Sequence, residues 1–137
     1  MSGDQRASEP DKRLDRLFDY TKFHMSLCLS ASGALVTVIA SADKSDVIKN
    51  LIGQPKALAA ALVSMLIAAM AGGVIASSSA SCLRFEDFWN VAHGPFALRC
   101  FNGRTWAAIE HAAFWLSVAL IVVAILSKAS VLHWLSF

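Results

Sequence analysis

The longest charge-free stretch of this chain runs from Ala57 to Leu83 and carries a small residue at every fourth position. Residues four apart lie one above the other on an α-helix, so these positions form a nearly straight stripe without large side chains. In a membrane such a stripe lets a second helix approach closely, because association there depends on packing rather than on the hydrophobic effect. We therefore expect a membrane helix in a tight bundle. The stripe consists of Ala60, Ser64, Ala68, Gly72, Ala76 and Ala80.

The composition agrees with a membrane location. Hydrophobic residues make up 56% of the 137 residues and charged residues 16%, against about 45–50% and about 25% in soluble domains. The excess is concentrated in three runs, and about 20 apolar residues can cross a bilayer as a helix. We predict an all-α membrane protein with three transmembrane helices. A polar segment, 1–24, precedes a membrane domain, 25–137, whose spans lie at about 23–42, 57–82 and 108–132.

The polar N-terminal segment has the pattern of an amphipathic helix. Ser8 can cap such a helix and Pro10 suits its first turn. Apolar side chains recur at Leu14, Leu17 and Phe18, while charged residues occupy the opposite face. We expect this helix to lie at the membrane surface and to continue into the first span.

The first span carries small and hydroxyl side chains at spacings of three and four residues. Such a face can approach another helix closely, and its hydroxyls can bond across the contact for roughly 0.6–2 kcal/mol each. We predict that this face packs against the small-residue stripe of the second span. It consists of Ser26, Ser30, Gly33, Ala34, Thr37 and Ser41.

The first span also ends in a possible signal-peptide cleavage pattern, Ala40-Ser41-Ala42. An export signal begins with a short positive segment, whereas the segment 1–24 is longer and has no net charge. We therefore favour an uncleaved first span. Cleavage, which would leave a two-span hairpin, is the alternative.

The orientation follows from the distribution of basic residues. Most of the lysines and arginines lie in the N-terminal segment and between the second and third spans. The positive-inside rule then places the N-terminus in the cytoplasm and the C-terminus on the opposite side. We expect a multi-pass protein of the bacterial inner membrane.

Both connections between spans carry helix patterns. In the first, Ser45 or Asp46 can cap a short helix that Gly53 ends. In the second, we predict an interfacial helix lying flat at the headgroups with a tryptophan as anchor. A partner-docking surface is the alternative. The shared face of this helix consists of Phe85, Phe88, Trp89 and Ala92, before His93-Gly94-Pro95.

The third apolar run is uninterrupted only over 112–127, which is short for a span. Extending it toward the C-terminus brings in Lys128, whose long stem can reach the surface, whereas extending it the other way buries Glu110 and His111. We favour the first choice, which places Glu110 and His111 at the membrane edge as a candidate polar site. The pair is either a proton-coupled or substrate-binding site, or an interfacial glutamate that pairs with Arg84 or Arg104 or accepts hydrogen bonds at the first turn of a helix.

We assign no catalytic, cofactor-binding or metal-binding residue. No catalytic or phosphate-binding motif occurs. A cluster of His93 with Cys82, Cys100 and Asp87 has no zinc spacing. In length and span count the chain resembles the haem-bearing anchor subunits of succinate dehydrogenase, which implies that two histidines could hold a haem. The candidates would be His24 and His111, but the second span contains no histidine and the quinone-site motifs are absent.

These patterns predict a non-enzymatic membrane protein that acts through helix–helix contacts. Small-residue faces are abundant, while polar groups suited to transport or catalysis are scarce. We expect the lipid bilayer and a membrane protein, or a second copy of this chain, as partners, and no nucleic acid, because basic clusters are absent. The role would be an accessory subunit, an assembly partner or a homo-oligomer. The alternative is a small transporter, or a pore-forming effector, that uses Glu110 as coupling group.

Overall fold

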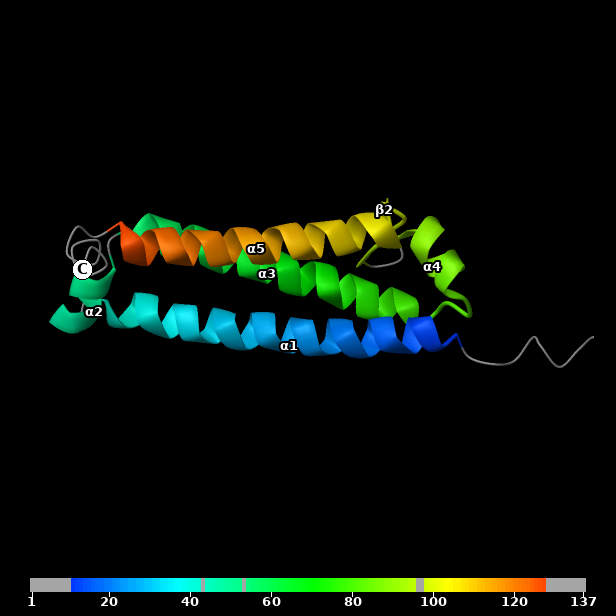
Figure 1. The fold of residues 1–137 in the computed structure, drawn as a ribbon, viewed down its shortest axis with the longest axis horizontal. Coiled ribbons are helices and arrows are strands. Elements are labelled where there is room, and N and C mark those ends of the chain that lie inside the picture. The colour runs from blue at the N-terminus through cyan, green and yellow to red at the C-terminus, as the bar shows by residue number, and fades with distance from the viewer. Residues whose placement is uncertain (1–10, 43, 53, 96–97, 128–137) are drawn as a thin grey trace, which may run out of the picture.

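The computed structural model describes residues 11–42, 44–52, 54–95 and 98–127. The three long helices run along one another in alternating directions, and short elements join them at both ends (Figure 1). Each long helix is long and apolar enough to cross a membrane, which supports the predicted three-span membrane protein. In chain order the elements are α1 (Lys12–Ser41), α2 (Asp46–Leu51), α3 (Pro55–Ser79), α4 (Phe85–Asn90), β1 (Ala92–His93), β2 (Phe101–Asn102) and α5 (Gly103–Leu126).

The N-terminal polar segment and the first span form one continuous helix, α1. Asp11 caps it, because its carboxylate accepts a hydrogen bond from the backbone N–H of Arg13 at 3.0 Å. The cap expected at Ser8 and the proline expected in the first turn lie outside the described residues, and the helix begins at Lys12. The charged residues of the segment from Lys12 onward therefore lie on the first turns of a helix that is long enough to span a membrane.

The two shorter spans are shifted from their predicted bounds. Helix α3 ends at Ser79, before Cys82. Helix α5 extends toward the N-terminus as far as Gly103 and ends at Leu126. The predicted extension of the third span past Lys128 lies outside the described part of the chain. Glu110 therefore lies seven residues, or about 10 Å, into a regular helix.

The connections are partly as predicted. Ser45 caps α2, with its hydroxyl accepting from the backbone N–H of Ile48 at 3.5 Å. In the second connection a helix does form, but it ends at Asn90, and Ala92 belongs instead to a two-residue strand paired with β2. Phe88 of α4 is fully buried, because Gly103 at the start of α5 leaves room for its ring. A Cβ at that glycine would lie 2.5 Å from the phenylalanine ring.

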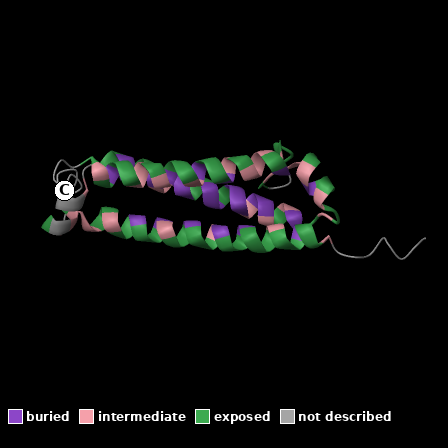
Figure 2. Cartoon of the chain, in the orientation of Figure 1, coloured by how far each residue is buried: buried purple, intermediate pink, exposed green. Residues whose placement is uncertain are grey.

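Helix α3 is the centre of the bundle and packs along both α1 and α5. Figure 2 shows buried residues along most of α3, whereas α1 and α5 keep broad exposed faces. Only the middle of the predicted small-residue stripe is buried: Ser64, Ala68 and Gly72 are enclosed, while Ala60 and Ala80 are exposed. Ala76 is half-buried.

The prediction that the small-residue face of the first span packs against this stripe is wrong. The small face of α1 is mostly exposed, from Ser26 to Thr37, and a Cβ at Gly33 would meet nothing within 4 Å. The opposite face of α1 is buried in its place. That face carries an ionisable side chain, His24, which would be costly to expose to lipid, whereas small apolar and hydroxyl side chains tolerate lipid. The buried face consists of Leu14, Thr21, His24, Cys28, Ser32 and Leu35.

Candidate functional site

The site begins with a contact between α1 and α5. Glu110 Oε1 lies 2.8 Å from His24 Nδ1, and both residues are buried, with 1% and 7% of their surface exposed. The sequence singled out both residues, Glu110 as a polar site and His24 as a possible haem ligand, but it did not predict that they pair. The structure pairs Glu110 with His24 of the first span rather than with Arg84 or Arg104.

Gly72 of the small-residue stripe forms the third wall of this contact. A Cβ at this position would lie 3.1 Å from Glu110 Oε1 and 3.6 Å from Thr21 Cγ2. The carboxylate and the threonine therefore converge on a point of α3 where no side chain stands. The stripe and the polar pair, which the sequence presented as separate features, meet at this one residue.

His111 follows the glutamate and contacts Tyr20 of α1. Its Nδ1 lies 2.8 Å from the carbonyl oxygen of Ala107, which can only accept, so Nδ1 carries the hydrogen. In the neutral ring Nε2 is then an acceptor, and the Tyr20 hydroxyl, 3.3 Å away, donates to it. Neutral His111 is thereby assigned a single tautomer.

Aromatic rings enclose His24. Tyr20 and His111 stack on it with ring centroids 5.7 and 5.8 Å away, and Phe114 meets it edge-on at 4.7 Å. Tyr20 was not predicted to belong to the site. Tyr20 precedes His24 by four residues, and Phe114 follows Glu110 by four. Residues four apart are neighbours on a helix, so this spacing could have indicated that both rings belong to the site.

One more polar group is buried beside the pair. Thr21 is completely enclosed, and its hydroxyl has no hydrogen-bond partner among the described residues. An unpaired buried hydroxyl costs about 1–3 kcal/mol. A buried hydroxyl without a hydrogen-bond partner among the described side chains therefore lies beside Glu110.

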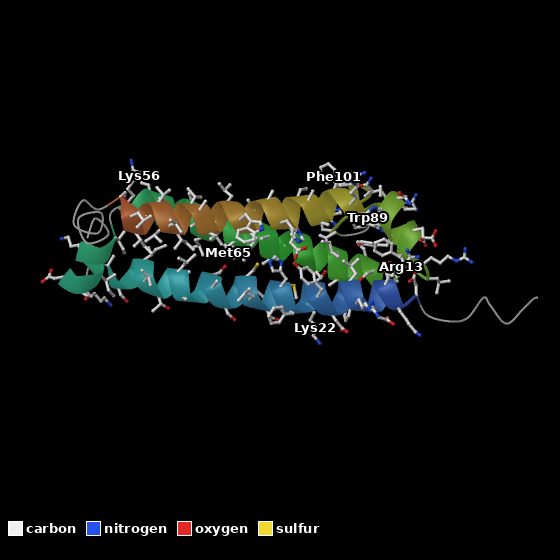
Figure 3. The ribbon with its side chains drawn as sticks, viewed as in Figure 1. Arg13, Lys22, Lys56, Met65, Trp89 and Phe101 are labelled. Carbon is white, nitrogen blue, oxygen red and sulfur yellow. The ribbon has the colours of Figure 1, made fainter. Side chains whose placement is uncertain are left out.

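The pair of His24 and Glu110 lies close to the charged end of α1. Lys22 is the last charged residue before the apolar part of the helix, and His24 follows it by two residues, or about 3 Å. The lysine side chain points away from α3 and α5 (Figure 3). Tyr20, which is 47% exposed, stands between Asp19 and Lys22 at the charged level.

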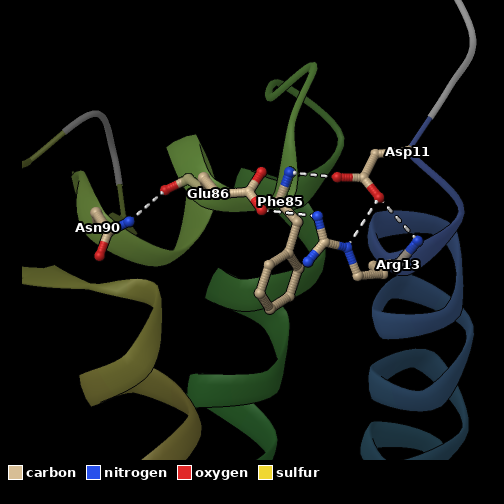
Figure 4. A network of polar contacts seen from close by, with 5 residues as sticks. All are labelled: Asp11, Arg13, Phe85, Glu86 and Asn90. Carbon is tan, nitrogen blue, oxygen red and sulfur yellow. Dashed lines mark hydrogen bonds and ion pairs between the residues drawn. The ribbon is translucent and has the colours of Figure 1, made fainter.

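A second polar network joins the start of α1 to α4 (Figure 4). Arg13 Nη2 lies 2.7 Å from Glu86 Oε1, and Asp11 accepts a bond from the backbone N–H of Phe85 at 2.9 Å. The backbone N–H groups of Phe85 and Arg13 hold the pKa of Asp11 below its ordinary value. Both charged side chains of the ion pair are exposed, so the pair contributes little to stability.

The geometry bears on metal and haem binding as well. The rings of His24 and His111 stack with their centroids 5.8 Å apart and an interplanar angle of 28°. Stacked rings do not aim their nitrogens at a common iron between them. In the described ranges, histidine, cysteine and acidic side chains form no group of three or more that could hold a metal ion.

The side chains gathered here, His24, Glu110, His111 and Tyr20, can donate and accept protons and hydrogen bonds. No protein-family model, curated protein or solved structure matches this chain. Two features of the geometry bear on function. One is the exposed small-residue face of α1, and the other is the buried pair of His24 and Glu110.

Proposed function

We propose that this chain is a small, non-enzymatic integral membrane protein that works by binding another membrane helix. The observation that carries this proposal is the exposed small-residue face of α1 between Ser26 and Thr37. Its partner would be a subunit of a membrane complex, with this chain as accessory subunit or assembly partner, or a second copy of this chain.

The face has the features of a helix-packing surface. At Gly33 the space beside the backbone is open. The hydroxyls of Ser26 and Thr37 donate to carbonyl oxygens of their own helix at 2.9 Å, so the face offers little unsatisfied polarity. Large exposed side chains, such as Phe23 and Val36, flank it. A second helix can approach such a face closely, and close approach is what drives association in lipid.

The topology we propose follows from the charges. The end of the bundle that carries α4 and the charged start of α1 would face the cytoplasm of a bacterium, in agreement with the positive-inside rule. The charged turns of α1 and the half-buried Trp89 of α4 would then lie at the cytoplasmic surface of the inner membrane.

The test is Gly33→Leu, with Ala119→Leu on the exposed face of α5 as the matched control. We expect Gly33→Leu to weaken association about tenfold, equivalent to about 1.4 kcal/mol, because the leucine keeps the helices apart. Crosslinking in native membranes and molar mass in mild detergent measure this. A parent protein that stays a single chain in both, or unchanged association of Gly33→Leu, would exclude the proposal.

A second candidate function is a small transporter or pore with Glu110 as its coupling group. The observation that favours it is the enclosure of the Glu110 carboxyl against His24, because ionisable groups enclosed among membrane helices are costly and commonly mark transport pathways. The measurement is proton or ion flux into proteoliposomes. We expect Glu110→Gln to abolish it, and a parent protein without flux would remove this candidate.

A further inference from the structure

We propose that His24 and Glu110 form a binding site for one exchangeable proton, reached from the charged end of α1 past Tyr20 and His111. The pair lies between α1 and α5 against Gly72 of α3, with 2.8 Å between His24 Nδ1 and Glu110 Oε1. This inference shares its site with the second candidate function. A site can, however, bind a proton without any flux, so the two stand or fall separately.

The charge balance of the pair favours an added proton. With neutral His24 donating from Nδ1, the carboxylate leaves the site with one negative charge. One added proton makes the site neutral overall, either as imidazolium and carboxylate or as imidazole and carboxylic acid. A buried site with no net charge avoids the cost of an isolated buried charge, so the low dielectric favours the proton-bound form.

Glu110 has no permanent positive charge bonded to it among the described residues. A lysine or arginine partner would balance its charge permanently, but in the described ranges no lysine or arginine bonds to it. The titratable groups that face the pair are Tyr20 and Cys28 of α1 and His111 of α5, while α3 presents Gly72, which does not titrate. Among the described side chains, His24 is the one that bonds to the carboxylate, and it balances the negative charge only with a proton bound.

A proton can reach the pair from the charged end of α1, where Tyr20 and His111 are exposed. His111 is exposed, and because its Nδ1 is committed to the Ala107 carbonyl, an incoming proton binds at Nε2. The Tyr20 hydroxyl, which donates to Nε2 of the neutral ring, can rotate and accept from the protonated ring. Tyr20 stands at the charged level of α1 and stacks on both histidines, so Tyr20 and His111 lie where a proton from the charged end of α1 approaches the pair.

The experiment is a pH titration of the full chain in lipid nanodiscs with isotope-labelled histidine and glutamate, followed by NMR. We expect the ring nitrogens of His24 and the carboxyl carbon of Glu110 to change together at one midpoint. In Glu110→Gln, which keeps the side-chain shape, this joint change should be lost, because the carboxylate that shares the proton with His24 is gone. Glu86→Gln, at the exposed ion pair, is the matched control and should leave it in place.

The outcomes separate a proton site from a fixed ion pair. Signals of His24 and Glu110 that stay constant over the whole pH range of the folded protein would overturn the proposal, and so would separate midpoints for the two groups. These readings come from the parent protein, so they hold even if a variant fails to fold. Tyr20→Phe keeps the ring stack and removes the hydroxyl; it should slow proton exchange at His24, and unchanged exchange would contradict the access route.

Discussion

The two halves of the bundle are held together in different ways. In the half near α2, apolar side chains such as Leu35, Leu58 and Ala124 pack around Ala61. At the edge of this half, Ser117 donates a hydrogen bond to the Ala61 carbonyl at 2.8 Å. In the half near α4, α1 and α5 meet through His24 and Glu110. This half has an apolar cluster as well, around Phe88 and Ile75, but it also encloses an acid and a base.

The difference shows which half is explained by stability alone. Apolar packing and one hydroxyl bond are ordinary means of joining helices in lipid. A buried acid–base pair is a poor means, because hydrophobic side chains of similar volume often stabilise a protein as well or better. Packing therefore accounts for the half near α2, whereas the polar half has a feature that packing does not require.

The largest effect is expected from Glu110→Ala. It leaves His24 buried without its partner, and breaking a buried pair in this way costs about 3–5 kcal/mol. Thermal unfolding in mild detergent measures the loss. The double variant His24→Leu/Glu110→Met removes both polar groups and should recover most of the stability. A double variant as unstable as the single one would mean that the pair itself holds this half together.

A smaller effect is expected from Gly72→Leu. Its Cβ would already lie 3.1 Å from Glu110 Oε1, so the larger side chain displaces the carboxylate, and overpacking costs about 1–3 kcal/mol. The control is Gly33→Leu, which enters open space and should leave unfolding of the single chain unchanged. Equal losses in the two variants would contradict the packing described for α1 and α3.

The smallest effect is expected from Ser117→Ala in the half near α2. It removes the hydroxyl bond to Ala61 and should cost about 0.6 kcal/mol, the average for such bonds between membrane helices. Ser26→Ala is the control, because the Ser26 hydroxyl bonds within its own helix. A loss above about 2 kcal/mol at Ser117 would show that this half, too, depends on a polar contact.

The sequence predicted the elements of this fold better than their contacts. Three apolar runs indicated three spanning helices because the required length and composition are local properties. The helix around Phe88 and the cap at Ser45 were also within reach of local patterns. The small strands β1 and β2 were not, because each has two residues and exists only by pairing with the other.

The face that α1 turns toward the bundle shows why contacts between helices were harder to predict than the helices themselves. Small residues at regular spacing made the Ser26–Thr37 face a plausible mate for α3. The structure buries the opposite face instead, since that rotation brings His24 to Glu110. Helical periodicity shows that a helix has two distinct faces but not which one a distant helix requires.

The sequence by itself determined that this chain has three membrane-length helices and that Glu110 and His111 interrupt the third apolar run. Both conclusions follow from the order of residues along a short stretch. Only the tertiary structure decided that Glu110 meets His24, 86 residues away, that Gly72 makes room for its carboxylate, and that the small face of α1 remains exposed. These depend on how three helices rotate and slide against one another, which no single helix specifies.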